Sequence, residues 1–188
     1  MKKRVLTIST IGVFSALSIV LVMLIHLPLI PAVPFLEYDP ADVPIYLITA
    51  VLGPVAGLIM TAIVSIVQGV TVSASSGWIG IVMHFLATGF FVAAEGIVLN
   101  ACRRLGKSDA FSLTAALSAG FTASVAVMIL WNLLFTPLYM GITLQQLLPL
   151  LPYIALFNVI KAGINGVATF VLYGLLKKPI TRFFPKKQ

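Results

Sequence analysis

The chain has 188 residues, of which 60% are hydrophobic and only 9% are charged. A soluble domain carries about 25% charged residues, so this composition excludes a water-soluble globular protein. The net charge of +7 does not indicate nucleic-acid binding, because eleven of the twelve basic residues form three short clusters without interleaved aromatic residues. We therefore expect one integral membrane domain over residues 1–188. Its long apolar runs favour helices over a β-barrel, whose strands alternate in short segments.

The first predicted helix covers residues 5–25. Its apolar run exceeds the length of about 7 to 15 residues that is typical of a signal peptide, so we expect a membrane span. Gly12 and Ala16 are small residues one helical turn apart, and such pairs let another helix approach closely in lipid. Two interpretations remain open at this stage. The pair contacts another helix of this chain, or it forms a docking face for a separate membrane subunit.

A loop over residues 26–44 is predicted next, because it contains five prolines. It also carries three of the five acidic residues, together with several large apolar side chains. A loop that is both apolar and acidic is unsuited to extending freely into water. We expect it to lie across the outer face of the membrane domain as a lid, and the alternative is a plain connector at the headgroups.

Five further helices are expected, over residues 41–52, 55–72, 78–102, 110–135 and 149–176. The first of these has about twelve residues and is too short to span a bilayer alone. It ends at Gly53-Pro54, and the alternative there is one kinked helix over residues 41–72.

Six spans satisfy the distribution of basic residues. With the N-terminus in the cytoplasm, the clusters 2–4, 103–107 and 177–187 all fall on the cytoplasmic side. The acidic loop then lies outside. The predicted fold class is therefore an all-α membrane protein, a single bundle of six transmembrane helices with both termini cytoplasmic.

Asn158, Lys161 and Asn165 are spaced three and four residues apart, so they share one face of the last predicted helix. A lysine at membrane depth costs about 2.5 to 3.5 kcal/mol on insertion scales, and it requires acceptors, a watery cavity or a ligand. We expect this face to form one wall of a polar cavity. As alternatives, the amides join helices through hydrogen bonds, and Glu95 pairs with Lys161 as a structural ion pair.

No catalytic or cofactor motif is present in the sequence. It has no HExxH motif, no phosphate-binding loop and no paired carboxylates inside the predicted helices. His84 has neither a second histidine nor a paired cysteine nearby, so we expect a packing role rather than a metal site. Trp78 is expected at the membrane interface, with ligand stacking as the alternative. The sequence thus indicates a ligand-binding membrane protein, not an enzyme, without cofactor or metal.

Three stretches carry a resemblance to a known family: PFLEYDPADVP, GPVAGLIMTAIVSIVQG and FNVIKAGINGVATFVLY. They resemble the substrate-binding S-components of energy-coupling factor (ECF) vitamin transporters, and most closely the riboflavin-specific members. The resemblance implies a multi-pass protein of the bacterial cytoplasmic membrane. It would capture its vitamin from outside and join a transmembrane coupling protein and two ATPase subunits. Gly12 and Ala16 occupy the positions of the family's alanine-xxx-alanine docking motif.

The resemblance also implies roles for individual residues. Asn132 and Asn165 would meet the polar edge of the flavin, and Lys161 would donate to a carbonyl or hydroxyl oxygen. Aromatic and apolar residues of the loop would cover the ring, and its carboxylates would accept from ribityl hydroxyls. The full predicted binding set is Phe35, Leu36, Glu37, Tyr38, Asp39, Trp78, Glu95, Asn132, Asn158, Lys161 and Asn165.

Other functions stay open on the sequence alone. Pantothenate, folate or another vitamin is the alternative substrate within the family. A self-contained secondary transporter or channel is the alternative class, and a membrane-embedded enzyme is a third.

Overall fold

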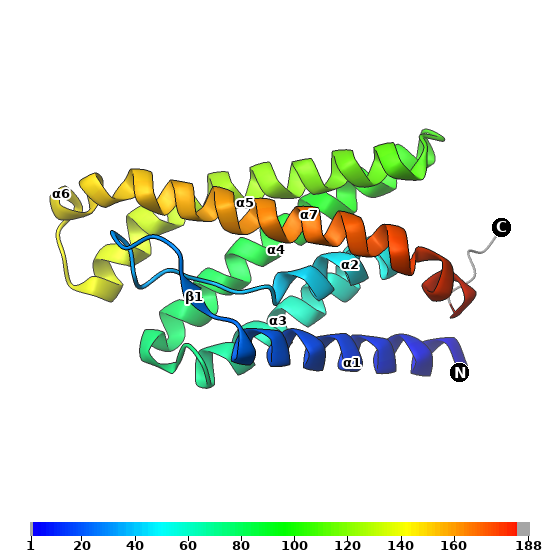
Figure 1. Cartoon of the computed structure of the whole chain (residues 1–188), viewed down its shortest axis with the longest axis horizontal. Helices are drawn as coiled ribbons and strands as arrows, with labels where there is room; N and C mark the ends of the chain where they lie inside the picture. The colour runs from blue at the N-terminus through cyan, green and yellow to red at the C-terminus, as the bar shows by residue number, and fades with distance from the viewer. Residues whose placement is uncertain (1, 184–188) are drawn as a thin grey trace.

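The computed structural model describes residues 2–183, and these are almost entirely helical (Figure 1). The expectation of an all-α fold is confirmed. The helices are α1 (Lys2–Leu24), α2 (Asp42–Leu52), α3 (Pro54–Val70), α4 (Gly77–Arg104), α5 (Asp109–Met140), α6 (Leu144–Leu147) and α7 (Leu151–Phe183). Two single 3₁₀ turns, η1 (Ala74–Ser76) and η2 (Leu148–Leu150), precede α4 and α7.

Four segments of the described chain are long and apolar enough to cross a membrane, namely those of α1, α4, α5 and α7. The apolar helices α2 and α3 are shorter, with 11 and 17 residues. The long helices run roughly side by side along the length of the molecule (Figure 1). The start of α1, the α4–α5 connection and the end of α7 lie at one end, and α6 lies at the other.

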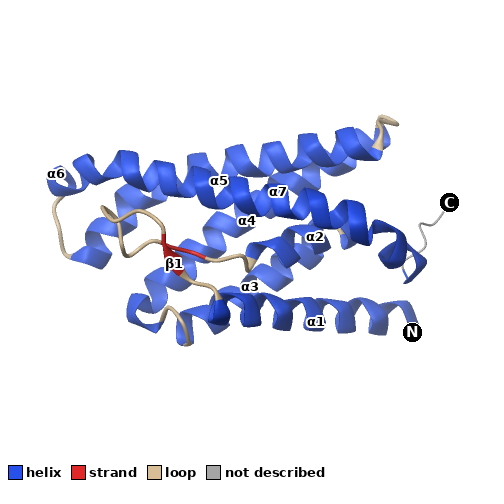
Figure 2. Cartoon of the chain, in the orientation of Figure 1, coloured by secondary structure: helices blue, strands red, loops and turns tan. Residues whose placement is uncertain are grey.

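The predicted loop between α1 and α2 contains a small antiparallel ladder, drawn in red in Figure 2. Strand β1 (Leu27–Pro28) pairs with β2 (Glu37–Tyr38), so that the intervening residues form a closed lobe. Val33 at the tip of this lobe is completely buried against Leu147 and Ile154. Packing of Val33 therefore holds the loop against α6 and α7, so the loop is more than a simple connection between two helices.

The break between α2 and α3 is a single residue, Gly53, in the left-handed region at φ 96°. Pro54 follows at the first helical position, where its missing N–H leaves no unpaired helix donor. One turn later, a Cβ atom on Gly57 would lie 2.0 Å from Thr49 Oγ1 and 2.8 Å from a methyl group of Val92. The absence of a side chain at Gly57 thus lets α2, α3 and α4 pack closely. Two separate helices are observed here, as predicted.

The end at residue 135 that was predicted for the fifth helix, over residues 110–135, is wrong. Helix α5 continues through Pro137 to Met140 and ends at Gly141, which has a left-handed φ of 64°. Proline removes one helical hydrogen bond but leaves the others intact, whereas the left-handed glycine redirects the chain. The predicted loop over 137–147 is correspondingly shorter, and it contains α6, whose start is stabilised by a capping box between Thr143 and Gln146.

Helix α7 also differs from its predicted limits of 149–176. Its first residue is Leu151, because residues 148–150 form the η2 turn, and it continues to Phe183. The hydropathy signal ends where the lysines begin, but basic residues are good helix formers and do not end a helix. Of the predicted C-terminal basic cluster, Lys186 and Lys187 lie outside the described residues.

Candidate functional site

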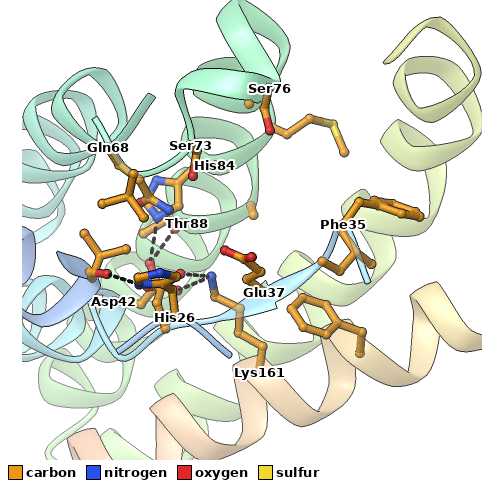
Figure 3. Close-up of a pocket in the computed structure, with 18 of the residues that line it drawn as sticks. His26, Phe35, Glu37, Asp42, Gln68, Ser73, Ser76, His84, Thr88 and Lys161 are labelled. Carbon is orange, nitrogen blue, oxygen red and sulfur yellow. Dashed lines mark hydrogen bonds and ion pairs between the residues drawn. The ribbon is translucent and has the colours of Figure 1, made fainter. Parts of the chain in front are cut away.

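A cavity of about 260 Å³ lies beneath the lid loop, between the ladder, the α3–α4 connection and α7. Six members of the predicted binding set line it, and they come from the loop and from α7: Phe35, Leu36, Glu37, Asp39, Asn158 and Lys161. Figure 3 shows the labelled loop residues Phe35 and Glu37 around the space into which Lys161 projects. The expected polar wall on the last helix therefore borders a real cavity.

The charge of Lys161 is balanced inside the site. Its Nζ atom lies 2.7 Å from Oδ2 of Asp39 and 4.0 Å from Oδ2 of Asp42. Both carboxylates are almost fully buried, and Lys161 retains some exposure towards the cavity. The alternative in which Glu95 pairs with Lys161 is thus wrong, because the lid and the start of α2 bring their carboxylates to the lysine first.

Asn165 fixes the lid to the helices and is completely buried. Its Nδ2 donates to the backbone carbonyl of Asp39 at 3.1 Å and to Oδ2 of Asp42 at 3.4 Å. Its Oδ1 accepts from the Tyr38 hydroxyl at 3.1 Å. Neither Asn165 nor Tyr38 lines the cavity, so the structure places both in the support of the site.

Asp42 is the point at which α2, α4 and α7 meet. Besides Asn165, it accepts a hydrogen bond of 2.7 Å from the Thr88 hydroxyl. The Nε2 atom of His84 lies 3.5 Å from the same carboxylate, and the other ring nitrogen is 2.7 Å from the Ser65 hydroxyl. Such a shared buried acceptor holds its surroundings rigidly, because each donor would be left unpaired if the carboxylate moved.

The pKa values of two neighbouring lid residues, Tyr38 and Asp39, are shifted from their ordinary values. Burial acts to raise the pKa of the Asp39 carboxyl group, but the ammonium of Lys161 and the Ala41 N–H hold that pKa below its ordinary value. Burial, with the neighbouring Asp39 carboxylate, raises the pKa of the Tyr38 hydroxyl. Asp39 therefore accepts as an anion while Tyr38 keeps the proton that it donates to Asn165.

Besides Tyr38 and Asn165, three further predicted site residues do not line this cavity. Asn132 lines a smaller adjoining pocket of about 130 Å³, but its amide donates to the Met128 carbonyl and accepts from the Thr136 hydroxyl. Trp78 is 62% exposed and packs edge-on against Phe135. Glu95 is fully buried among α4 and its neighbours, and it does not line the cavity.

Several cavity residues were missed by the sequence analysis. They are polar or ionisable side chains from the segment after α1, from α2, from α3, from the α3–α4 connection and from α4: His26, Asp42, Gln68, Ser73, Ser75, Ser76, His84 and Thr88. Gln68 in an otherwise apolar helix and the serine-rich turn after it are signals that could have indicated this wall. No group of three or more metal-ligating side chains lies together in the described part of the chain.

The proposed docking residues of α1 face away from the rest of the chain. Gly12 and Ala16 are both exposed, and a Cβ atom on Gly12 would meet nothing within 4 Å. Ser15 and Ser18, on another face of the same helix, are buried against the rest of the bundle. Among the described residues, the small pair is therefore not used for packing within this chain.

Comparisons with known proteins agree with this geometry. The family model for "ECF transporter, substrate-specific component" matches residues 6–173. The fold is similar to that of a solved S component of a bacterial ECF transporter, with a TM-score of 0.75 and 24% sequence identity. That similarity covers 99% of this chain and 100% of the solved one. A comparison with curated protein sequences gave no match.

Proposed function

Because the chain belongs to the family of substrate-specific components of ECF transporters, we propose that it is a riboflavin-binding S-component of the bacterial cytoplasmic membrane. As a member of that family it is a multi-pass transport protein and not an enzyme, and it binds its substrate as a ligand without a cofactor. Its partners are an energising module of transmembrane and ATPase subunits.

The charge balance of the cavity carries the choice of substrate. Among the described lining residues, one ammonium group faces three carboxylates, those of Glu37, Asp39 and Asp42. These lining residues carry more negative than positive charge, so they would repel an anionic vitamin such as pantothenate or folate. Riboflavin is uncharged and its ribityl hydroxyls supply donors, which carboxylate oxygens accept. Phe35 and Leu36 add the apolar surface that a flavin ring requires.

The roles of the predicted residues follow from their positions. Lys161 and Asn158 border the cavity and contact the ligand, while Glu37 accepts from a ribityl hydroxyl. Asn165 and Tyr38 hold the lid in the closed position through their hydrogen bonds. Asn132 contributes to the wall of the adjoining pocket, Trp78 packs against Phe135 beside it, and Glu95 serves the packing of α4.

Fluorescence titration tests the substrate. Purified protein should quench riboflavin fluorescence on binding, and protein that co-purifies with ligand should release a flavin spectrum on denaturation. Excess pantothenate, folate or thiamine should leave this quenching unchanged. Colourless protein that does not quench riboflavin would refute the choice of riboflavin, and displacement by thiamine would identify a cationic vitamin as the substrate.

We further propose six crossings with both termini in the cytoplasm. The basic start of α1, the α4–α5 connection and the end of α7 lie at one end of the molecule, and the acidic lid lies towards the other (Figure 1). Labelling of single cysteines introduced at Lys107 and at Ser75, after replacement of Cys102, tests this arrangement in intact cells. An impermeant reagent should modify the cysteine at position 75 and spare the one at position 107.

A further inference from the structure

The cavity has a second polar wall, opposite the aromatic lid, that the proposed function leaves unassigned. It is formed where α3 passes through η1 into α4, and Figure 3 shows Gln68, Ser73 and His84 together there, apart from Phe35. This wall is separate from the polar face of α7. Two of its side chains carry buried polar atoms without a hydrogen-bond partner in residues 2–183.

One of these atoms is Nε2 of His84. The other ring nitrogen, Nδ1, lies 2.7 Å from the Ser65 hydroxyl, which can donate to it. In the neutral ring the proton then belongs on Nε2, because Nδ1 is the acceptor of this hydrogen bond, and Nε2 lies 3.5 Å from Oδ1 of Asp42. Nε2 forms no hydrogen bond with this oxygen, which already accepts from Thr88. His84 thus presents an N–H group at the cavity wall.

The other atom is Oε1 of Gln68. Gln68 follows Ser65 by three residues on α3, so its amide lies on the same side of that helix as the support of His84. A carboxamide combines an acceptor and a donor on neighbouring atoms. A buried amide oxygen without a partner costs free energy, and a ligand donor would recover it. Gln68 and His84 line the same cavity and together offer it one acceptor and one donor.

The two amides that the sequence analysis assigned to the flavin edge, Asn132 and Asn165, are already engaged by other protein groups. Asn165 is saturated by Tyr38, Asp39 and Asp42. Asn132 is likewise engaged along its own helix with Met128 and Thr136. A ligand ring whose edge needs both a donor and an acceptor from the protein finds them in His84 and Gln68 on the α3–α4 wall.

Resting on the proposed function, we propose that Gln68 and His84 read the lactam edge of the ligand's heterocycle. Gln68 Oε1 accepts from the ring N–H, and His84 Nε2–H donates to the adjacent ring carbonyl. The ring itself lies between Met83 and Phe35, both of which line the cavity. These two polar residues therefore determine specificity for vitamins with an N–H and a C=O side by side in the ring.

Binding of riboflavin and N3-methylriboflavin to the intact protein tests the inference. The methyl group removes the ring N–H that Gln68 is assigned to accept. In the natural protein the methylated ligand should bind at least about fivefold more weakly, since a buried polar group loses its partner. In Gln68→Met, riboflavin should weaken by a similar factor, and the two ligands should bind equally. Gln145→Met, on the exposed side of α6, is the matched control and should behave as the natural protein.

Two further variants control for misfolding. Gln68→Glu keeps the acceptor and the shape, and His84→Phe keeps the ring without its donor. His84→Phe should weaken riboflavin and N3-methylriboflavin by the same factor, because it acts on the carbonyl. An unchanged preference for riboflavin over N3-methylriboflavin in Gln68→Met, with normal folding by circular dichroism, would overturn the inference.

The same binding measurements distinguish a failure of riboflavin as the substrate from a failure of this inference. If the natural protein does not bind riboflavin but binds pterin, another neutral lactam, and Gln68→Met abolishes this binding, riboflavin is refuted and the inference stands. If it binds thiamine or pantothenate and neither lactam, or binds none of these ligands, both proposals are overturned.

Discussion

At the scale of single residues, the site depends on one buried cation and its two carboxylates. Lys161→Met leaves Asp39 and Asp42 without their counter-charge, and removing one partner of a buried pair costs about 3–5 kcal/mol. We therefore expect a large loss of stability in thermal unfolding and a weakening of riboflavin binding by about 1 kcal/mol or more.

Asn165→Ala should weaken binding similarly by releasing the lid.

Lys177→Met is the matched control for this prediction. Lys177 forms an ion pair with Asp109, but both side chains are more than a third exposed. Exposed pairs contribute about 0–1 kcal/mol, so this variant should remain close to the natural protein. The double variant with Asp39→Asn and Lys161→Met should recover part of the lost stability. Equal effects at positions 161 and 177 would contradict the structural role of the buried pair.

The pH dependence of this pair follows from the carboxyl group of Asp39. Its folded-state pKa lies below the ordinary value of 3.8, so its contribution is present above that value and is lost as pH falls through the folded pKa. The difference in melting temperature between the natural protein and Asp39→Asn should stay constant from about pH 8 to about pH 5 and shrink below about pH 4. A difference that already shrinks between pH 8 and pH 5 would place the pKa of Asp39 above its ordinary value.

Sequence spacing predicted the side-by-side placement of Asn158 and Lys161, because helical periodicity is a local property. It could not predict which carboxylate reaches Lys161. That choice depends on how the lid folds back onto α7, more than 120 residues away in the sequence. The same limit explains why Asn165 was assigned to the ligand. Its partners become visible only once the lid and α2 are in place.

At the scale of elements, the contact of α2, α3 and α4 at Gly57 sets how closely the helices approach. Gly57→Ala places a methyl group against Thr49 and Val92, so the helices must shift or Thr49 must rotate. We expect a loss of about 1–3 kcal/mol in unfolding experiments. Gly174→Ala in α7 is the control, because a Cβ there meets nothing within 4 Å. It should be neutral or stabilise the helix by up to about 1 kcal/mol. Equal destabilisation by both would refute the close packing.

The existence of the long helices was predictable from hydropathy, but their ends were not. The helix predicted over residues 110–135 stops short of Pro137, whereas α5 continues through Pro137 to Met140 and is followed by Gly141. The difference lies in geometry, since proline fits the helical φ and the left-handed glycine does not. The lobe between β1 and β2 was expected as a lid from its composition, while its anchor, Val33 against α6 and α7, required the fold.

At the scale of the whole molecule, the proposed ligand-binding cavity and the proposed docking face lie on different surfaces. The cavity lies beneath the lid, whereas Gly12 and Ala16 face outward on α1, which otherwise packs against α2 and α3. Small residues on an exposed membrane helix permit close approach of another helix, and in lipid this packing drives association. The two functions should therefore be separable by mutation.

Gly12→Leu and Ala16→Leu test this separation. Each adds a bulky side chain at an exposed position of α1, so riboflavin affinity should stay unchanged in fluorescence titration. Uptake of labelled riboflavin in cells that also produce the coupling protein and both ATPase subunits should be abolished, because the partner helix can no longer approach. Ala126→Leu makes the same change at an exposed position of α5 and should leave uptake intact. Normal uptake in both α1 variants would remove this face from docking, and loss of riboflavin binding would show that α1 supports the cavity itself.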